Sequence, residues 1–228
     1  MTLDNKNFSK SRSLYKAPLS KRKALKIVES SYLAAATALI WIALYYLPIG
    51  GAVFRLALPL PLVLLQIRRG VKTGIEGVTI CVMLLTALMG PLRGPLVLFP
   101  YGLLSLWLGY SWQKGWNWWL SWSVGVSIGT MGFLIRVLVL SILVGENLWV
   151  ILTRAGAGLL EKGIDIFNLS FTPDMRQVQV VALFLIITQE IVYVLCLHAL
   201  AYWIFPRLKS YIPEPPSLLE NLISLKSN

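Results

Sequence analysis

Long apolar stretches that are almost free of charge constrain the fold of this chain most. Residues 120–144 contain one charged side chain, Arg136, and residues 177–205 contain only Glu190. A stretch of about 20 such residues crosses the hydrocarbon core of a bilayer as a helix. Hydrophobic residues make up 57% of the chain and charged residues 14%, against about 45–50% and about 25% in soluble domains. The sequence therefore predicts an all-α, polytopic membrane helical bundle.

Turn-forming residues divide the chain into about six predicted transmembrane spans. The spans cover residues 31–47, 52–67, 74–89, 96–112, 120–144 and 177–205. Pro59 and Pro61 interrupt the second span, because each proline removes a backbone donor. Irregular backbone at membrane depth is tolerated only where it is buried in protein or lines a cavity. The second span is therefore a candidate wall of a binding site.

The predicted organisation has three parts. They are a basic tail over residues 1–27, a six-span membrane domain over residues 28–206, and a tail with a short amphipathic helix over residues 207–228.

Between the last two spans, polar side chains recur with helical spacing at Arg154, Glu161, Asp165 and Asn168. This spacing predicts an amphipathic external helix at about residues 149–168, lying in the membrane interface. A partly inserted hairpin is the alternative.

The placement of positive charge predicts the topology. With six spans both termini share one side, and that side collects fifteen cations. They are Lys6, Lys10, Arg12, Lys16, Lys21, Arg22, Lys23, Lys26, Arg68, Arg69, Lys72, Lys114, Arg207, Lys209 and Lys226. Cytoplasmic segments of membrane proteins are enriched in Lys and Arg, so both termini are predicted to be cytoplasmic. The basic tail is expected to contact anionic lipid rather than nucleic acid, in a bacterial plasma membrane or, in a photosynthetic cell, a thylakoid membrane.

Residues for common catalytic chemistry are few and scattered. One histidine and two cysteines cannot build a catalytic zinc site, and the chain has no P-loop, so neither a metal nor another cofactor is expected. The motif Gly125-Val-Ser127-Ile-Gly129 matches a nucleophile elbow, with His198 as a possible partner. That elbow requires a strand-to-helix turn, whereas glycines four apart in an apolar helix favour close helix packing. No enzymatic activity is expected.

Charged residues within the spans are the candidate functional residues, since each is costly in lipid and needs a partner or a wet cavity. Arg136 and Glu190 are expected at similar depths and are predicted to form an ion pair. The pair serves either as a structural clamp or in ligand binding and gating. Arg55 and Arg93 add two cations to the same half of the bundle. Converging arginines suit a carboxylate or phosphate ligand, and solvated snorkelling arginines are the alternative.

The order of these features resembles that of a known class of membrane proteins. After the basic tail come Ala34-Ala-Ala-Thr-Ala38, a Pro/Gly loop, the proline-broken second span, Arg68-Arg-Gly-Val-Lys72 and Gly90-Pro-Leu-Arg-Gly-Pro95. Over about residues 28–206 this order is similar to the substrate-binding S components of energy-coupling-factor vitamin transporters. It is most similar to the uncharacterised YybS-like membrane proteins, which share that six-helix pattern.

The resemblance implies a ligand site and a partner. A small vitamin-like ligand would bind near the outer face under the loop at residues 48–54, and Ala34 and Ala38 would dock a T-component-like membrane subunit. Small residues four apart form a flat groove for another helix. The long 145–176 connection departs from the family pattern. The predicted function is S-component-like uptake of a small, anionic or zwitterionic metabolite together with partner membrane subunits. The alternative is a scaffold that holds a membrane complex together. A transporter needs a ligand cavity of about 300 Å³ or more, whereas a scaffold does not.

The predicted topology can be tested by cysteine labelling in sealed cells. With Cys81 and Cys196 replaced by serine, a single cysteine placed within residues 1–26 should be protected from a membrane-impermeant maleimide, because this tail is expected to be cytoplasmic. A single cysteine placed within residues 145–176 should be labelled. Labelling of the tail from outside intact cells would reverse the topology.

Overall fold

The protein is an all-α bundle, as the sequence predicts. The computed structural model describes residues 20–48, 50–166, 174–210 and 212–216, and these residues contain no β-strand. The helices are α2 (Lys21–Tyr46), α3 (Gly51–Ala57), α4 (Leu60–Arg69), α5 (Val71–Met89), α6 (Tyr101–Gln113), α7 (Trp118–Val144), α8 (Leu148–Ile166) and α9 (Met175–Ile204), with 3₁₀ turns η1 (Pro95–Leu98) and η2 (Pro206–Leu208). The first 19 residues of the basic tail and the amphipathic helix predicted after Ser217 lie outside the described residues.

Local sequence signals set the ends of the long helices. Ser20 caps α2 by accepting a hydrogen bond from the Lys23 amide. Gly145 ends α7 at φ 77°, a left-handed conformation that glycine adopts without strain. Asp174 and Gln177 form a reciprocal capping box at the start of α9. These caps satisfy backbone groups that the first and last turns of a helix leave without partners.

The two prolines of the second span separate α3 from α4. Pro59 precedes α4 and Pro61 lies in its first turn, where a missing amide hydrogen costs nothing. Leu58 at the break and Leu60 after it are both buried. The irregular backbone is therefore covered by protein, as the sequence predicts for a broken span at membrane depth.

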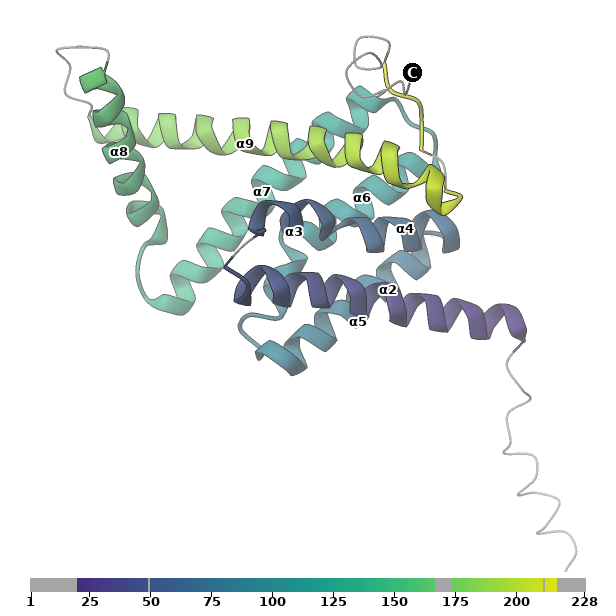
Figure 1. Cartoon of the computed structure of the whole chain (residues 1–228). Helices are drawn as coiled ribbons and strands as arrows, with labels where there is room; N and C mark the ends of the chain where they lie inside the picture. Colours follow the sequence, from purple (N-terminus) through teal and green to yellow (C-terminus); the bar gives the residue numbers. More distant parts are fainter. Residues whose placement is uncertain (1–19, 49, 167–173, 211, 217–228) are drawn as a thin grey trace, which may run out of the picture.

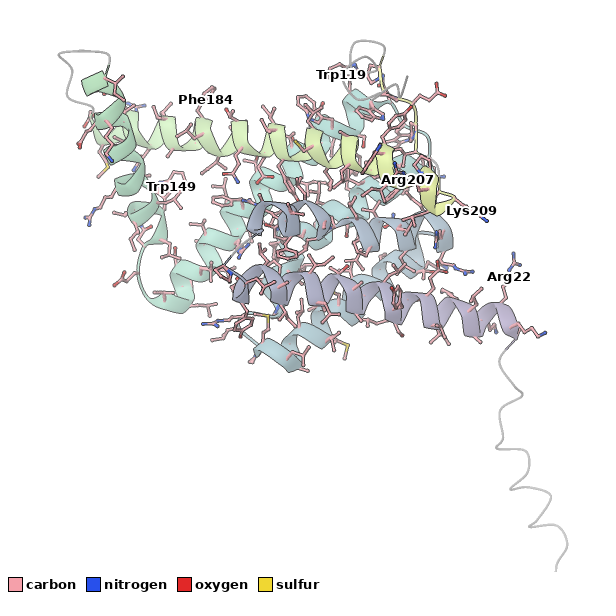
Figure 2. The ribbon with its side chains drawn as sticks, in the orientation of Figure 1. Arg22, Trp119, Trp149, Phe184, Arg207 and Lys209 are labelled. Carbon is pink, nitrogen blue, oxygen red and sulfur yellow. The ribbon has the colours of Figure 1, made fainter. Side chains whose placement is uncertain are left out.

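A cluster of ion pairs and hydrogen bonds joins α2, α4 and the segment after α9 at one end of the bundle. Arg68 at the end of α4 pairs with Glu29 of α2 at 3.0 Å, and Arg69 pairs with the same carboxylate. Arg68 also donates to the Leu208 carbonyl and, at 3.3 Å, to the Ser210 hydroxyl after α9. We call this the basic end, since Arg22, Arg207 and Lys209 also lie there (Figure 2).

Five helical segments among the described residues are long and apolar enough to cross a membrane: α2, the α3–α4 segment Gly51–Arg69, α5, α7 and α9. Helix α5 starts at the basic end, so it finishes at the opposite end. Helix α7 starts at the basic end, where Trp118 donates to the Pro213 carbonyl at 2.9 Å. The segment between them must return across the bundle. It does so as a composite of η1 and α6, whose 13 residues alone span about 20 Å.

The two interrupted segments, α3–α4 and η1–α6, are the broken crossings, and they occupy the centre of the bundle. Leu65 of α4 and Leu104 and Leu108 of α6 are fully buried there. Helices α7 and α9 extend beyond the far end of α2, and α8 lies across their ends (Figure 1). Helix α8 begins where the Leu148 amide donates to the Ser141 hydroxyl of α7 at 3.0 Å. It covers most of the segment where helical periodicity predicts an amphipathic helix, and its Arg154 and Glu161 side chains are exposed.

The alanine pair of α2 faces the interior of this chain. Ala34 and Ala38 are 0% and 1% exposed, on the face of α2 that packs against α4 and α5. The prediction that they dock a partner helix is therefore wrong, because the chain's own helices already fill that groove. Small side chains at this spacing allow close packing between helices, and here the neighbours belong to the same chain.

Enlarging either alanine should destabilise the bundle itself. We expect Ala34→Leu or Ala38→Leu to lower the free energy of unfolding in detergent by about 1–3 kcal/mol, the usual cost of overpacking a filled core. The partly exposed Ala35 provides the matched control, and Ala35→Leu should change stability by less. Wild-type stability in both Ala34→Leu and Ala38→Leu would contradict this packing role.

Candidate functional site

A cavity of about 560 Å³ lies between α2, α3, α6, α7 and α8, towards the end of the bundle opposite the basic end. We call it the arginine cavity. Its lining residues are Leu44, Arg55, Pro100, Tyr101, Phe133, Arg136, Val137, Leu140, Leu148, Ile151 and Leu152. Two predicted site residues, Arg55 and Arg136, thus share one cavity whose remaining walls are apolar or aromatic.

Arg55 is fixed by residues of α9. One of its terminal nitrogens lies 3.6 Å from a carboxylate oxygen of Glu190. With its side-chain oxygen turned toward Arg55, Gln189 accepts hydrogen bonds from both terminal nitrogens at 2.8 and 3.0 Å. Tyr193 donates its hydroxyl hydrogen to the Arg55 carbonyl at 3.0 Å, and its ring lies under the guanidinium at 5.6 Å. Together these contacts hold α3 against α9.

Glu190 is the buried partner of this ion pair. It is 1% exposed, whereas the Arg55 side chain is 31% exposed. Its second oxygen has no hydrogen-bond partner and lies against Gly129 of α7, where a Cβ atom would collide with it. A buried carboxylate is costly unless paired, so Glu190 depends on the single nearby guanidinium of Arg55.

The predicted Arg136–Glu190 pair is wrong, and the geometry of α7 explains why. Gly129 and Arg136 are seven residues apart, so they share a face of α7 but lie about 10 Å apart along its axis. Glu190 packs at the level of Gly129. Arg136 lies two turns further from the basic end, where α9 has diverged from α7 (Figure 1). Its side chain therefore contacts α2 instead of α9.

Arg136 has neutral partners. It donates to the Tyr45 hydroxyl at 2.9 Å, and its guanidinium lies 5.2 Å from the centre of the Trp41 ring. None of the ion pairs found among the described residues includes Arg136. Its positive charge is therefore supported by an aromatic face and a hydroxyl but is not neutralised by a carboxylate.

Two expected parts of the site lie elsewhere. Arg93 is exposed in the turn after α5 and is not among the residues that line the arginine cavity. The loop at residues 48–54, whose residue 49 is outside the described residues, is not the main cover of the cavity. Three residues of α8, Leu148, Ile151 and Leu152, form that wall. The long 145–176 connection, which departs from the S-component pattern, thus supplies part of the candidate site.

Sequence reasoning missed the aromatic partners of the arginines. Trp41 and Tyr45 are four residues apart on α2, and this spacing places both side chains on one helix face. The sequence signal for these partners was an aromatic pair near the end of one span, opposite another span that carries an arginine. Gln189 beside Glu190 was a second signal, since two adjacent polar residues in an apolar helix require partners.

The histidine and the serine of the hydrolase-like motif lie apart. Ser127 is exposed and donates to the Ser123 carbonyl at 3.0 Å. His198 is buried, with Nε2 3.1 Å from the Ser121 hydroxyl. Gly125 and Gly129 lie where α7 meets Val194 and Glu190 of α9, so the motif matches the packing role predicted for its glycines.

The chemistry of the arginine cavity favours an anion with an apolar body. Two guanidiniums line it, Glu190 offsets the charge of Arg55, and the charge of Arg136 remains. Guanidiniums bind carboxylates and phosphates through charge-assisted hydrogen bonds, and the aliphatic walls suit apolar groups. Among the described residues, no group of three or more His, Cys, Asp or Glu side chains is placed to hold a metal ion.

Comparison with known proteins gave one match. A family model described as "Predicted membrane protein (DUF2232)" matches residues 34–220, a range that includes every residue lining the arginine cavity. No curated protein and no solved structure matches the chain.

The Arg55–Glu190 ion pair can be tested with a double-mutant cycle in which the two single substitutions are expected to differ in cost. Arg55→Gln should cost about 3–5 kcal/mol of unfolding free energy in detergent, because it strands the buried Glu190 carboxylate. Glu190→Gln should cost less, since Arg55 is partly exposed and keeps its bonds to Gln189. The double mutant should recover part of the loss, with a coupling energy of at least about 1 kcal/mol.

The matched control for this cycle replaces Arg136 in place of Arg55. The Arg136→Gln and Glu190→Gln changes should be additive to within about 0.5 kcal/mol, because their side chains have no partner in common. Coupling in the Arg136 cycle combined with additivity in the Arg55 cycle would restore the pairing predicted from the sequence.

Proposed function

The chain belongs to the DUF2232 family of predicted membrane proteins, and we propose that this integral membrane protein binds a small organic anion in the arginine cavity. In the proposed topology the cavity opens away from the cytoplasm, because the basic end is the cytoplasmic end. The protein would act as the binding subunit of an uptake system, in the manner of the S components that its sequence resembles.

The observation that carries this proposal is the Arg136 side chain within the arginine cavity. A guanidinium in a largely apolar site is costly, yet the contacts of Arg136 are a hydroxyl and an aromatic ring. An anionic ligand would supply the missing negative charge and engage Arg55 on the adjacent wall. The cavity of about 560 Å³ lies within the usual size range of small-molecule sites.

The scaffold alternative accounts less well for this cavity. A protein that only holds other subunits together has no need of a hollow that two guanidiniums line. Uptake also requires a partner that supplies energy. With Ala34 and Ala38 buried, we propose that such a subunit docks on another face of the bundle.

Anion binding can be tested on the purified protein in a non-ionic detergent. We expect benzoate, octanoate or phenyl phosphate to raise thermal stability, whereas benzamide and octanamide, which lack the charge, should not. A ligand at ten times its Kd stabilises the folded state by about 1.4 kcal/mol. Arg136→Gln should weaken binding of the anion at least about tenfold, because it removes a charged hydrogen-bond donor.

Arg93→Gln is the matched control. It removes an arginine from the same half of the bundle but outside the lining of the arginine cavity, so binding should be unchanged. Equal loss of binding in both variants would indicate a general effect of surface charge. If none of the three anions stabilises the wild-type protein, the scaffold function is favoured.

A further inference from the structure

A second hollow adjoins the arginine cavity on the side of α9. It measures about 870 Å³ and lies between the end of α2, α3 and α9. We call it the lateral groove. Its α9 wall includes Leu185 and Val192, which are 49% and 53% exposed. Helix α9 is long and apolar enough to cross a membrane, so we expect a groove with exposed aliphatic side chains along it to face lipid.

The lateral groove and the arginine cavity meet at Leu44 and Arg55, which line both. The Arg55 guanidinium therefore stands where the cationic arginine cavity borders the lateral groove. Its contacts with Gln189 and Glu190 come from α9, while Arg136 lies on the far wall of the arginine cavity. Positive charge is concentrated on one side of Arg55, and Leu56, Leu185 and Val192 line the other.

This arrangement matches a molecule with an anionic head and an apolar chain. A head in the arginine cavity would contact Arg136 and the partly exposed Arg55, offsetting the cost of cations near lipid. A chain attached to that head would leave past Arg55 into the lateral groove, where it would contact aliphatic side chains such as Leu185 and Val192. An anion without a chain would use the cavity and leave the groove unoccupied.

We propose that the ligand is an anionic amphiphile, with a carboxylate or phosphate head and an apolar chain, that reaches the arginine cavity sideways from the bilayer through the lateral groove. This inference rests on the proposed function, and it names the class of ligand and its route. Each methylene that leaves water for an apolar site strengthens binding about fourfold. The groove is therefore the main source of discrimination between lipid-like and water-soluble anions.

The test compares long-chain with short probes on the full-length protein in a non-ionic detergent. The carboxylate probes are oleate and butyrate, and the phosphate probes are dodecyl phosphate and inorganic phosphate. Val192→Trp places an indole ring in the lateral groove and narrows it. Val180→Trp makes the same change on α9 at a residue that is 62% exposed and outside the groove lining.

We expect Val192→Trp to weaken oleate and dodecyl phosphate binding at least tenfold and to leave butyrate and inorganic phosphate binding unchanged. Val180→Trp should change none of the four, and Arg136→Gln should weaken all of them. Unchanged oleate and dodecyl phosphate binding in Val192→Trp would overturn the lateral route, and so would an equal loss for long and short probes. If Arg136→Gln leaves all four unchanged, the proposed anion site itself is wrong.

Discussion

A bilayer offers no water to an exposed backbone group, and this constraint governs the arrangement of the whole bundle. Four crossings, α2, α5, α7 and α9, are single continuous helices. The other two are broken, one between α3 and α4 and one between η1 and α6. Both breaks are covered: Leu58 is buried at the first, and Leu96 and Val97 are buried beside the second. Where the broken crossings meet the far ends of their neighbours, packing is incomplete, and the arginine cavity lies there.

The fold class was predictable because hydropathy and turn residues report directly on membrane crossing. The two arginines of the candidate site were also predictable, since an ionisable residue in a span needs a special environment. The ion pair was not, because a count of residues along each span gives depth but not helix tilt. Residue counts therefore placed Arg136 and Glu190 at similar depths in the membrane, although α7 and α9 diverge. The burial of Ala34 and Ala38 was equally hidden, since a small-residue groove looks the same whichever helix fills it.

Helix α8 shows how an unusual connection contributes to a site. Its exposed Arg154 and Glu161 face away from the protein, while Leu148, Ile151 and Leu152 line the arginine cavity. An amphipathic helix placed this way adds a wall to the space between α2, α3, α6 and α7. Helices α7 and α9 extend beyond α2, and α8 lies across their ends (Figure 1).

The cluster at the basic end has a consequence for biogenesis. Arg68 meets Glu29 across 39 positions of sequence, so this contact can form once α4 has left the ribosome. Its bonds to Leu208 and Ser210 span 140 and 142 positions and must wait until α9 and the residues that follow it have been synthesised. Domains acquire structure as synthesis proceeds, so α4 is joined to α2 and to the segment after α9 in two separate stages. A nascent chain that stops before α9 therefore retains an arginine whose donors to Leu208 and Ser210 are still unused.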